Sequence, residues 1–262
     1  MNAPLIQITK SGVACSLTAR EQTRMRTVFD RTHCLRFPKL LEPALLHPIQ
    51  TRIEKAGFYE KDYRKVTNLT VRYLNRLNDK VVDNMLNFLL NNEQLFRLIR
   101  ETTGCLGISG FAGRVYRMSP HTGHYDSWHD DLRDHRLIAM SMNLSTEVYS
   151  GWILQIRDTR SGHIVHEAAN TGFGDAVLFR LAPFLEHRVT GVEGTASRTA
   201  FSGWFRSQPH YQPIVNPSEE KSFSSEFEKE KVPGQASGFK KFNVCHAKRS
   251  SLSPDEWRAP CL

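Results

Sequence analysis

Residues 174–189 read GDAVLFRLAPFLEHRV, and this stretch decides the fold class. Two short apolar runs, rich in β-branched and aromatic residues, lie on either side of a turn, which is typical of antiparallel strands. The same pattern continues in both directions over about residues 108–206, with turn residues such as Gly172 and Gly194 between the runs. About seven such runs predict a closed barrel or a two-layered sandwich of strands.

The chain before this core has helical periodicity. Thr18 and Glu21 form a capping box, which predicts the start of a first helix. A second helix is expected within residues 38–56. The strongest helical pattern covers residues 78–103, where apolar residues recur at three- and four-residue steps. Two adjacent asparagines could divide this stretch into two helices, and Gly104 is a suitable C-terminal stop.

Helices first and strands afterwards predict an α+β fold, with the helices packed outside a sheet. We therefore divide the chain into three parts. Residues 1–107 are an N-terminal helical support region, residues 108–207 are the β core, and residues 208–262 are a flexible C-terminal tail. In the tail, Ser, Glu and Lys largely replace the aliphatic residues that a packed core needs.

Composition limits the classes of partner. The net charge is +8 and the isoelectric point is near 9.4, which favours anions. No helix-turn-helix, zinc-finger or RNA-binding signature accompanies the charge, so a nucleic-acid partner is not expected. The five cysteines are scattered and odd in number, which argues against a disulfide framework and favours the reducing cytoplasm. We see no signal peptide and no membrane-spanning run, and the oligomeric state stays open.

Two overlapping His-x-Asp motifs are candidate metal ligands: His124-Tyr125-Asp126 and His129-Asp130-Asp131. Two imidazoles and one carboxylate suit Fe(II), because they bind it well and leave coordination positions free. On an extended strand, residues i and i+2 project to the same side, so the His and the Asp of either motif could reach one metal. A second His must then come from a distant strand.

The context of these motifs resembles the 2-oxoglutarate and Fe(II)-dependent oxygenases, in particular the prolyl 4-hydroxylase-like branch. The similar region is residues 113–206, and the resemblance implies a double-stranded β-helix core of the jelly-roll or cupin-like kind. The matching elements follow the family's order: Tyr116, Pro120, Gly123, Trp128-His129-Asp130-Asp131, Arg136, Met142-Asn143-Leu144-Ser145, Gly174-Asp175-Ala176-Val177-Leu178-Phe179, Glu186-His187-Arg188-Val189, Gly194, Arg198 and Gly203-Trp204-Phe205. One departure is Tyr149-Ser150-Gly151-Trp152, which stands where the family usually has a Gly-Gly pair.

The resemblance implies that His129, Asp131 and His187 are the iron ligands. In the family, the His-x-Asp motif comes seven to nine residues before the Arg that opens the next strand. His129 lies seven residues before Arg136, whereas His124 lies twelve before it. His124 and Asp126 are therefore expected in a polar loop, and His121 and His135 are expected to face solvent.

The resemblance also implies a site for 2-oxoglutarate. Arg198, eleven residues after His187, is similar to the co-substrate arginine of the family, whose planar donor fork suits a carboxylate. The common Arg-x-Ser pattern is absent, although Ser202 should point the same way as Arg198 on a regular strand. Tyr116 and Asn143 stand where the family often places further co-substrate donors, and Tyr116 could equally be a core aromatic residue.

The implied reaction is hydroxylation of an unactivated carbon in a prolyl or peptide, amino-acid or small-metabolite substrate, with decarboxylation of 2-oxoglutarate to succinate. Ascorbate is an optional further cofactor in this family. A carboxylate at Asp131 argues against halogenation, because halogenating relatives usually have a small residue there. The alternative is a cupin-like metal-binding or regulatory protein without oxygenase turnover, which would not need Arg198.

Overall fold

The computed structural model describes residues 4–64, 71–122 and 126–209. Nearly all of the predicted tail, residues 208–262, therefore lies outside the described residues, and so does His124. Within the described part of the chain, no helix is long and apolar enough to cross a bilayer.

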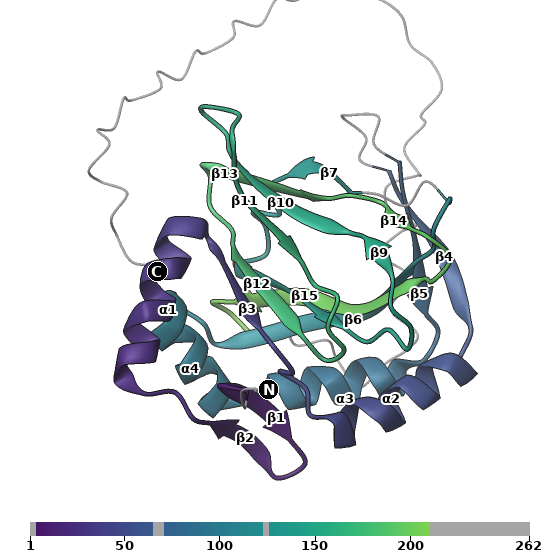
Figure 1. Cartoon of the computed structure of the whole chain (residues 1–262), viewed down its shortest axis with the longest axis horizontal. Coiled ribbons are helices and arrows are strands. Elements are labelled where there is room, and N and C mark those ends of the chain that lie inside the picture. The colour runs from purple at the N-terminus through teal and green to yellow at the C-terminus, as the bar shows by residue number, and fades with distance from the viewer. Residues whose placement is uncertain (1–3, 65–70, 123–125, 210–262) are drawn as a thin grey trace, which may run out of the picture. The chain divides into compact units, whose positions relative to one another are not determined.

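Two antiparallel sheets form the core and lie face to face (Figure 1). The larger sheet has the strand order β3-β12-β8-β15-β6-β5-β4. Its strands are β3 (Cys34–Phe37), β12 (Ala176–Arg180), β8 (Arg136–Asn143), β15 (Arg198–Arg206), β6 (Gly110–Met118), β5 (Val71–Leu77) and β4 (Phe58–Arg64). The smaller sheet has the order β11-β10-β13-β7, made of β11 (Ile164–Ala169), β10 (Ile153–Asp158), β13 (Leu185–Val189) and β7 (Asp126–His129). This arrangement confirms the predicted α+β fold with a double-stranded β-helix core.

Two short two-stranded pairs complete the strands. The first joins β1 (Ile6–Thr9) to β2 (Gly12–Cys15), and the second joins β9 (Ser150–Gly151) to β14 (Val192–Glu193). The backbone at Gly151 of β9 is in the left-handed conformation, with φ 73°. A Cβ at this position would lie 2.5 Å from the Gly191 carbonyl oxygen, so only glycine fits here.

Four helices cover the larger sheet on the face away from the smaller one (Figure 1). They are α1 (Ala19–Thr32), α2 (Pro43–Lys55), α3 (Lys80–Leu90) and α4 (Glu93–Thr103). Their apolar sides pack against the sheet in one cluster, where Leu95 and Ile99 of α4 join Phe111 and Phe205 of the strands. Full burial of side chains of this size contributes roughly 1.5–3 kcal/mol each. The helices therefore support the sheet and leave its other face for a site.

The predicted helix boundaries are confirmed in their physical detail. The Thr18–Glu21 capping box is present at the start of α1. Asn92 begins α4 and accepts hydrogen bonds from the amides of Gln94 and Leu95, so the asparagine pair does divide the long stretch. Gly104 ends α4 in the left-handed conformation, with φ 68°.

The prediction of a purely helical region before the core is wrong in one respect. Strand β3 forms one edge of the larger sheet, and β4 and β5 form the other. A four-residue strand such as β3 is too short to show a period of two, and its partner β12 lies about 140 residues further along the chain. Sequence periodicity could not reveal it, because its pairing is purely tertiary.

Helix α3 protects an open part of strand β6 with side chains instead of a strand. Strand β5 pairs with β6 only at Tyr116 and Arg117, which leaves the earlier backbone groups on that edge uncovered. Two α3 side chains and that of its C-cap, four residues apart, bind them. Asp83 accepts from the Val115 amide, Asn87 pairs with both backbone groups of Gly113, and the C-cap Asn91 pairs with both of Phe111. Four helical residues rise about 6 Å and two strand residues about 6.8 Å, so the spacings match. An exposed edge of this kind would otherwise invite pairing with another chain.

Asp83 is the imperfect member of this ladder, because a carboxylate cannot donate to the strand as the two asparagines do. Burial raises the pKa of Asp83 from 3.8 to about 6, against the opposing effects of the Val115 amide and Arg76. A raised carboxyl pKa means that the folded protein binds more protons than the unfolded chain, so this group costs stability as the pH rises from about 4 through 6.

We predict that Asp83→Asn raises the free energy of unfolding by roughly 1–3 kcal/mol at pH 8. This gain in the free energy of unfolding should fall to less than half at pH 4.5, because the wild-type Asp83 is then largely protonated in the folded protein and no longer destabilises it as an ionised group. Urea unfolding at both pH values measures the change in the free energy of unfolding. Asn87→Asp is the reverse substitution at the neighbouring position of the ladder, and we expect it to destabilise the protein. An equal gain at both pH values would contradict this account of Asp83.

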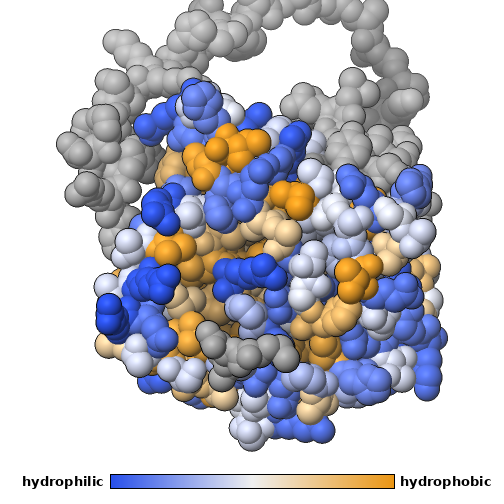
Figure 2. Space-filling model, in the orientation of Figure 1, coloured by the Kyte–Doolittle hydropathy of each residue, from blue (hydrophilic) through white to orange (hydrophobic). Residues whose placement is uncertain are grey.

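Figure 2 shows that polar and charged residues cover most of the visible face, with apolar groups between them. The large exposed apolar side chains of the described residues are spread over several elements, for example Phe88 of α3 and Ile164 of β11. Scattered exposure of this kind is usual for a folded protein.

Candidate metal and co-substrate site

The register of two strands brings two histidines together. In the pairing of β13 with β7, His187 lies directly opposite His129. Directly opposite residues of an antiparallel pair project to the same face, and the two imidazole centroids are 4.1 Å apart. The distant strand that the sequence required is therefore β13.

Asp131 reaches the same point from outside the strand. Its carboxylate oxygen Oδ2 lies 3.6 Å from His129 Nε2 and 3.8 Å from His187 Nε2. The expectation that His129 and Asp131 would both lie on an extended strand is wrong, because β7 ends at His129 and Asp131 has φ 55°. The chain turns back in the left-handed conformation, which Asp tolerates better than most residues. One potential ligand atom from each of the three residues lies within 4.8 Å of those of the other two.

The loop that presents Asp131 is strained and is held by the larger sheet. Asp134 and His135 also have positive φ values, 52° and 58°, and each such residue costs on the order of 1–3 kcal/mol. Arg206 of β15 donates two hydrogen bonds to the Asp134 carbonyl oxygen, at 2.8 and 2.6 Å. The Ser207 amide binds the His135 carbonyl oxygen at 3.0 Å. These contacts fix the backbone that carries the carboxylate.

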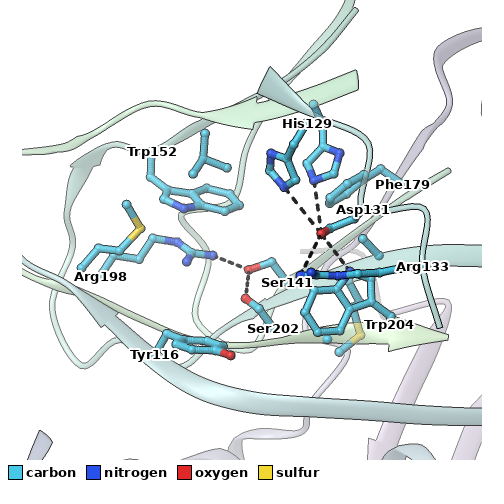
Figure 3. Close-up of a pocket in the computed structure, with 16 residues that line it drawn as sticks. Tyr116, His129, Asp131, Arg133, Ser141, Trp152, Phe179, Arg198, Ser202 and Trp204 are labelled. Carbon is cyan, nitrogen blue, oxygen red and sulfur yellow. Dashed lines mark hydrogen bonds and ion pairs between the residues drawn. The ribbon is translucent and has the colours of Figure 1, made fainter. Parts of the chain in front are cut away.

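Two further side chains hold the carboxylate itself, and the dashed line from Trp204 in Figure 3 marks one of these two contacts. The Trp204 indole donates to Asp131 Oδ2 at 3.1 Å, and Arg136 Nη1 donates to Oδ1 at 3.3 Å. The Arg136 guanidinium stacks over the Trp204 ring at 3.5 Å. Burial alone would raise the pKa of Asp131, but the hydrogen bond with His129 and the electrostatic interactions with His129, His187 and Arg136 hold it well below its usual range.

The donor set fits Fe(II). The ring nitrogen Nδ1 of His129 lies 2.6 Å from the Ser127 carbonyl oxygen. Since a carbonyl only accepts, Nδ1 carries the proton, and the lone pair of Nε2 is left for a metal. The side chains of His129, Asp131 and His187 are only 3%, 10% and 7% exposed. Two imidazoles and a carboxylate on one side of a cavity are the ligands that non-haem Fe(II) oxygenases use.

A second buried group, Arg198, lies at the other end of the cavity (Figure 3). Its Nε donates to the Tyr149 hydroxyl at 3.0 Å and its Nη2 to Ser141 Oγ at 2.8 Å, and its guanidinium stacks on Trp152 at 3.5 Å. Burial lowers the pKa of Arg198, which is 3% exposed. No carboxylate of the described residues forms an ion pair with it, so this cation lacks the anionic partner that a buried charge needs.

One cavity of about 170 Å³ contains both groups. This is smaller than the ~300–1,000 Å³ typical of drug-sized ligands, and it suits a small co-substrate. Tyr116 and Ser202 line it, and Ser202 Oγ lies 2.9 Å from Ser141 Oγ. The lining comes from both sheets: Tyr116, Met118, His129, Asp131, Arg133, Ala139, Met140, Ser141, Trp152, Phe179, His187, Val189, Arg198, Ser202, Gly203 and Trp204.

Asn143 does not line this cavity, contrary to expectation. Its side-chain amide donates to the Gly172 carbonyl oxygen and accepts from the Ser145 amide, both at 3.0 Å, so it anchors the loop at Gly172. We therefore leave Asn143 out of the site. His121 and His135 are exposed, as expected.

The surroundings of Arg198 include three residues to which the sequence analysis gave no role: Ser141, Tyr149 and Trp152. A signal for two of them existed. Tyr149 and Trp152 belong to the segment that departs from the family's Gly-Gly pattern, and both aromatic side chains contact the arginine.

Residues 113–206 match the family model of the 2OG-Fe(II) oxygenase superfamily. This core is similar to that superfamily. A search of curated protein sequences gives no significant match.

Solved structures of 2OG-Fe(II) oxygenases share the fold. An oxidoreductase of the 2OG-Fe(II) oxygenase family from Burkholderia pseudomallei aligns with a TM-score of 0.51 and 14% identity, over 71% of this chain and 91% of that one. A prolyl hydroxylase from Trichoplax adhaerens, in complex with a hypoxia inducible factor peptide, aligns with a TM-score of 0.52 and 16% identity, over 72% of this chain and 90% of that one. A non-heme α-ketoglutarate-dependent epimerase from nogalamycin biosynthesis aligns with a TM-score of 0.52 and 10% identity, over 72% of this chain and 84% of that one.

We predict that Trp204→Phe lowers the affinity for Fe(II) about tenfold, because loss of an outer hydrogen bond to a ligand typically costs 10–100-fold. Competition with a chelator under anaerobic conditions measures the affinity. Trp128→Phe is the matched control, since Trp128 contacts Arg157 and Arg188 instead of the carboxylate. Equal affinities in the wild type and Trp204→Phe would show that this hydrogen bond does not position Asp131.

Proposed function

We propose that this chain is an oxygenase that binds Fe(II) through His129, Asp131 and His187 and binds 2-oxoglutarate through Arg198. It couples decarboxylation of 2-oxoglutarate to succinate with hydroxylation of an unactivated carbon. The observation that carries the proposal is the buried Arg198 guanidinium, without an acidic partner among the described residues, in the same cavity as the three ligands. A cupin-like protein that only binds metal has no need for such a cation.

Arg198 has the donors that a carboxylate needs. A guanidinium has five N–H groups, and Tyr149 and Ser141 accept from two of them. The remaining N–H groups are available for bidentate binding, which holds a carboxylate in one orientation. One of the Ser141 and Ser202 hydroxyls donates to the other, which leaves one hydroxyl proton as a further donor beside it. Trp152 fixes the plane of the guanidinium by stacking on it.

The residues around the metal position hold its ligands and limit access of water. When bound, Fe(II) supplies the activation of oxygen together with the keto acid, and the chain supplies the geometry. Trp204 and Arg136 keep the Asp131 carboxylate ionised and oriented toward the two histidines. The Phe179 ring packs 4.6 Å from that of His187 and forms an apolar wall there.

The substrate proposed from the fold is a prolyl or peptide, amino-acid or small-metabolite molecule. The Trichoplax relative binds a peptide and the nogalamycin relative is an epimerase, so the shared fold leaves the substrate class open. Ascorbate is proposed as an assay additive because of the family. A cytoplasmic location is proposed from the free thiols of Cys15, Cys34 and Cys105, which agree with a reducing compartment.

We predict that Arg198→Ala raises the KM for 2-oxoglutarate by about 10–100-fold, since a hydrogen-bonded charged group contributes roughly 1.5–3 kcal/mol. Iron-dependent succinate formation measures KM. Arg180→Ala is the control, because Arg180 pairs with Asp30 and does not line the cavity. An unchanged KM in Arg198→Ala would mean that another cation binds that carboxylate. Fe(II) binding without any succinate formation would favour the cupin-like alternative.

A further inference from the structure

A second arginine lines the cavity beside the metal ligands. Arg133 follows Asp131 by two residues, and Figure 3 shows it at the end of the cavity opposite Arg198. Its side chain is 62% exposed, unlike that of Arg198. Once the ligands and Arg198 have their roles, Arg133 is the one charged residue of the described lining that remains unused.

The backbone of Arg133 is fixed while its side chain is only weakly held. Its amide donates to the Asp131 carbonyl oxygen at 2.9 Å, and its own carbonyl accepts from the Arg136 amide at 3.1 Å. Its only ion pair within the described residues is with Asp131 Oδ1, at 4.0 Å. Exposed pairs of this kind contribute about 0–1 kcal/mol, so the guanidinium can turn to an incoming anion at little cost.

Asp131 does not depend on Arg133. Trp204 and Arg136 already bind its two oxygens at 3.1 and 3.3 Å, closer than Arg133. Arg136, at the end of the same loop, is held firmly where Arg133 is not. Its side chain is 10% exposed, stacks on Trp204 and forms ion pairs with Asp131 and Asp134. The loop thus carries one arginine for structure and one that faces the mouth of the cavity.

We propose that Arg133 binds a carboxylate of the primary substrate, which is therefore a small carboxylic acid such as a free or N-acylated amino acid, not an internal residue of a polypeptide. This inference rests on the proposed function and narrows its substrate class. A carboxylate oxygen about 2.8 Å from Nη2 lies within about 7 Å of Asp131 Oδ1, given the 4.0 Å between Nη2 and that oxygen. The carbon presented to the metal is then only a few bonds from the carboxylate.

The walls near Arg133 agree with such a substrate. Phe179 and Trp204 line the side of the cavity that Arg133 occupies in Figure 3 and offer contact to an aliphatic or aromatic portion of the substrate. Among the lining residues, Asp131 is the only acid, and it faces the histidines and Trp204. An internal prolyl residue has no carboxylate a few bonds from its ring and would leave Arg133 without a partner.

The test uses the full chain loaded with Fe(II) and 2-oxoglutarate. The probes are the L-amino acids and their N-acetyl derivatives, each as the free acid and as the carboxamide, together with a doubly capped prolyl peptide. Substrate-stimulated succinate formation is measured for each. We expect at least one acid to stimulate the reaction, with its carboxamide at least tenfold poorer in kcat/KM.

Arg133→Gln should raise the KM for that acid by about 10–100-fold and leave the KM for its carboxamide nearly unchanged, since a charge-assisted pair contributes roughly 1.5–3 kcal/mol. Arg133→Lys should give a KM for the acid between those of the wild type and Arg133→Gln, because an ammonium keeps the charge without the planar donor fork. Arg97→Gln is the matched control, because Arg97 is 64% exposed on α4 and its one ion pair among the described residues is with Glu101.

Three results would overturn the proposal: equal use of acid and carboxamide, stimulation by the capped peptide alone, or no stimulation by any acid. An unchanged KM for the acid in Arg133→Gln would also overturn it. Failure of the proposed function is distinguishable, because a wild-type protein that does not bind 2-oxoglutarate in the presence of Fe(II) would fail before any substrate is added.

Discussion

The hydrogen bond from the Trp204 indole to the Asp131 carboxylate is the contact on which the rest of the site depends. It joins the two sheets, since Trp204 lies on β15 of the larger sheet and the carboxylate faces His129 and His187 of the smaller one. Arg136 of β8 adds a second link from the larger sheet. Without these donors, a carboxylate on a left-handed, strained turn would have no fixed orientation. The ligand set is therefore a property of how the sheets meet.

Strand β15 organises the whole cavity. Arg198, Ala200, Ser202 and Trp204 alternate along it, so their side chains share one face. The arginine that we assign to the co-substrate lies at one end of this row and the donor to the carboxylate ligand lies at the other. The spacing of the two ends is set by about 3.4 Å per residue of strand. The opposite face of β15 carries Phe201 and Phe205, which pack in the cluster shared with the helices. Helix packing thus fixes the strand, and the strand fixes the site.

Much of this was predictable from local chemistry. The caps of α1 and α4 depend only on neighbouring residues, and the alternation that places Ser202 beside Arg198 follows from a regular strand. The resemblance to a known family led to His129, Asp131 and His187, which the structure brings within ligand distance of one another. Features that depend on distant partners were not predictable. The left-handed turn at Asp131 needs Arg206 and Trp204 to hold it, and the place of Asn143 is set by the loop at Gly172.

The most direct test of the account is an anaerobic titration of the metal-free protein with Fe(II) and then 2-oxoglutarate, monitored for the weak visible charge-transfer band of the chelate. The account predicts that the band appears with one equivalent of each in the wild type and is lost in His187→Ala. Appearance of the band in His187→Ala, or Fe(II) binding in the wild type without any band, would contradict the claim that these ligands and the co-substrate share one cavity.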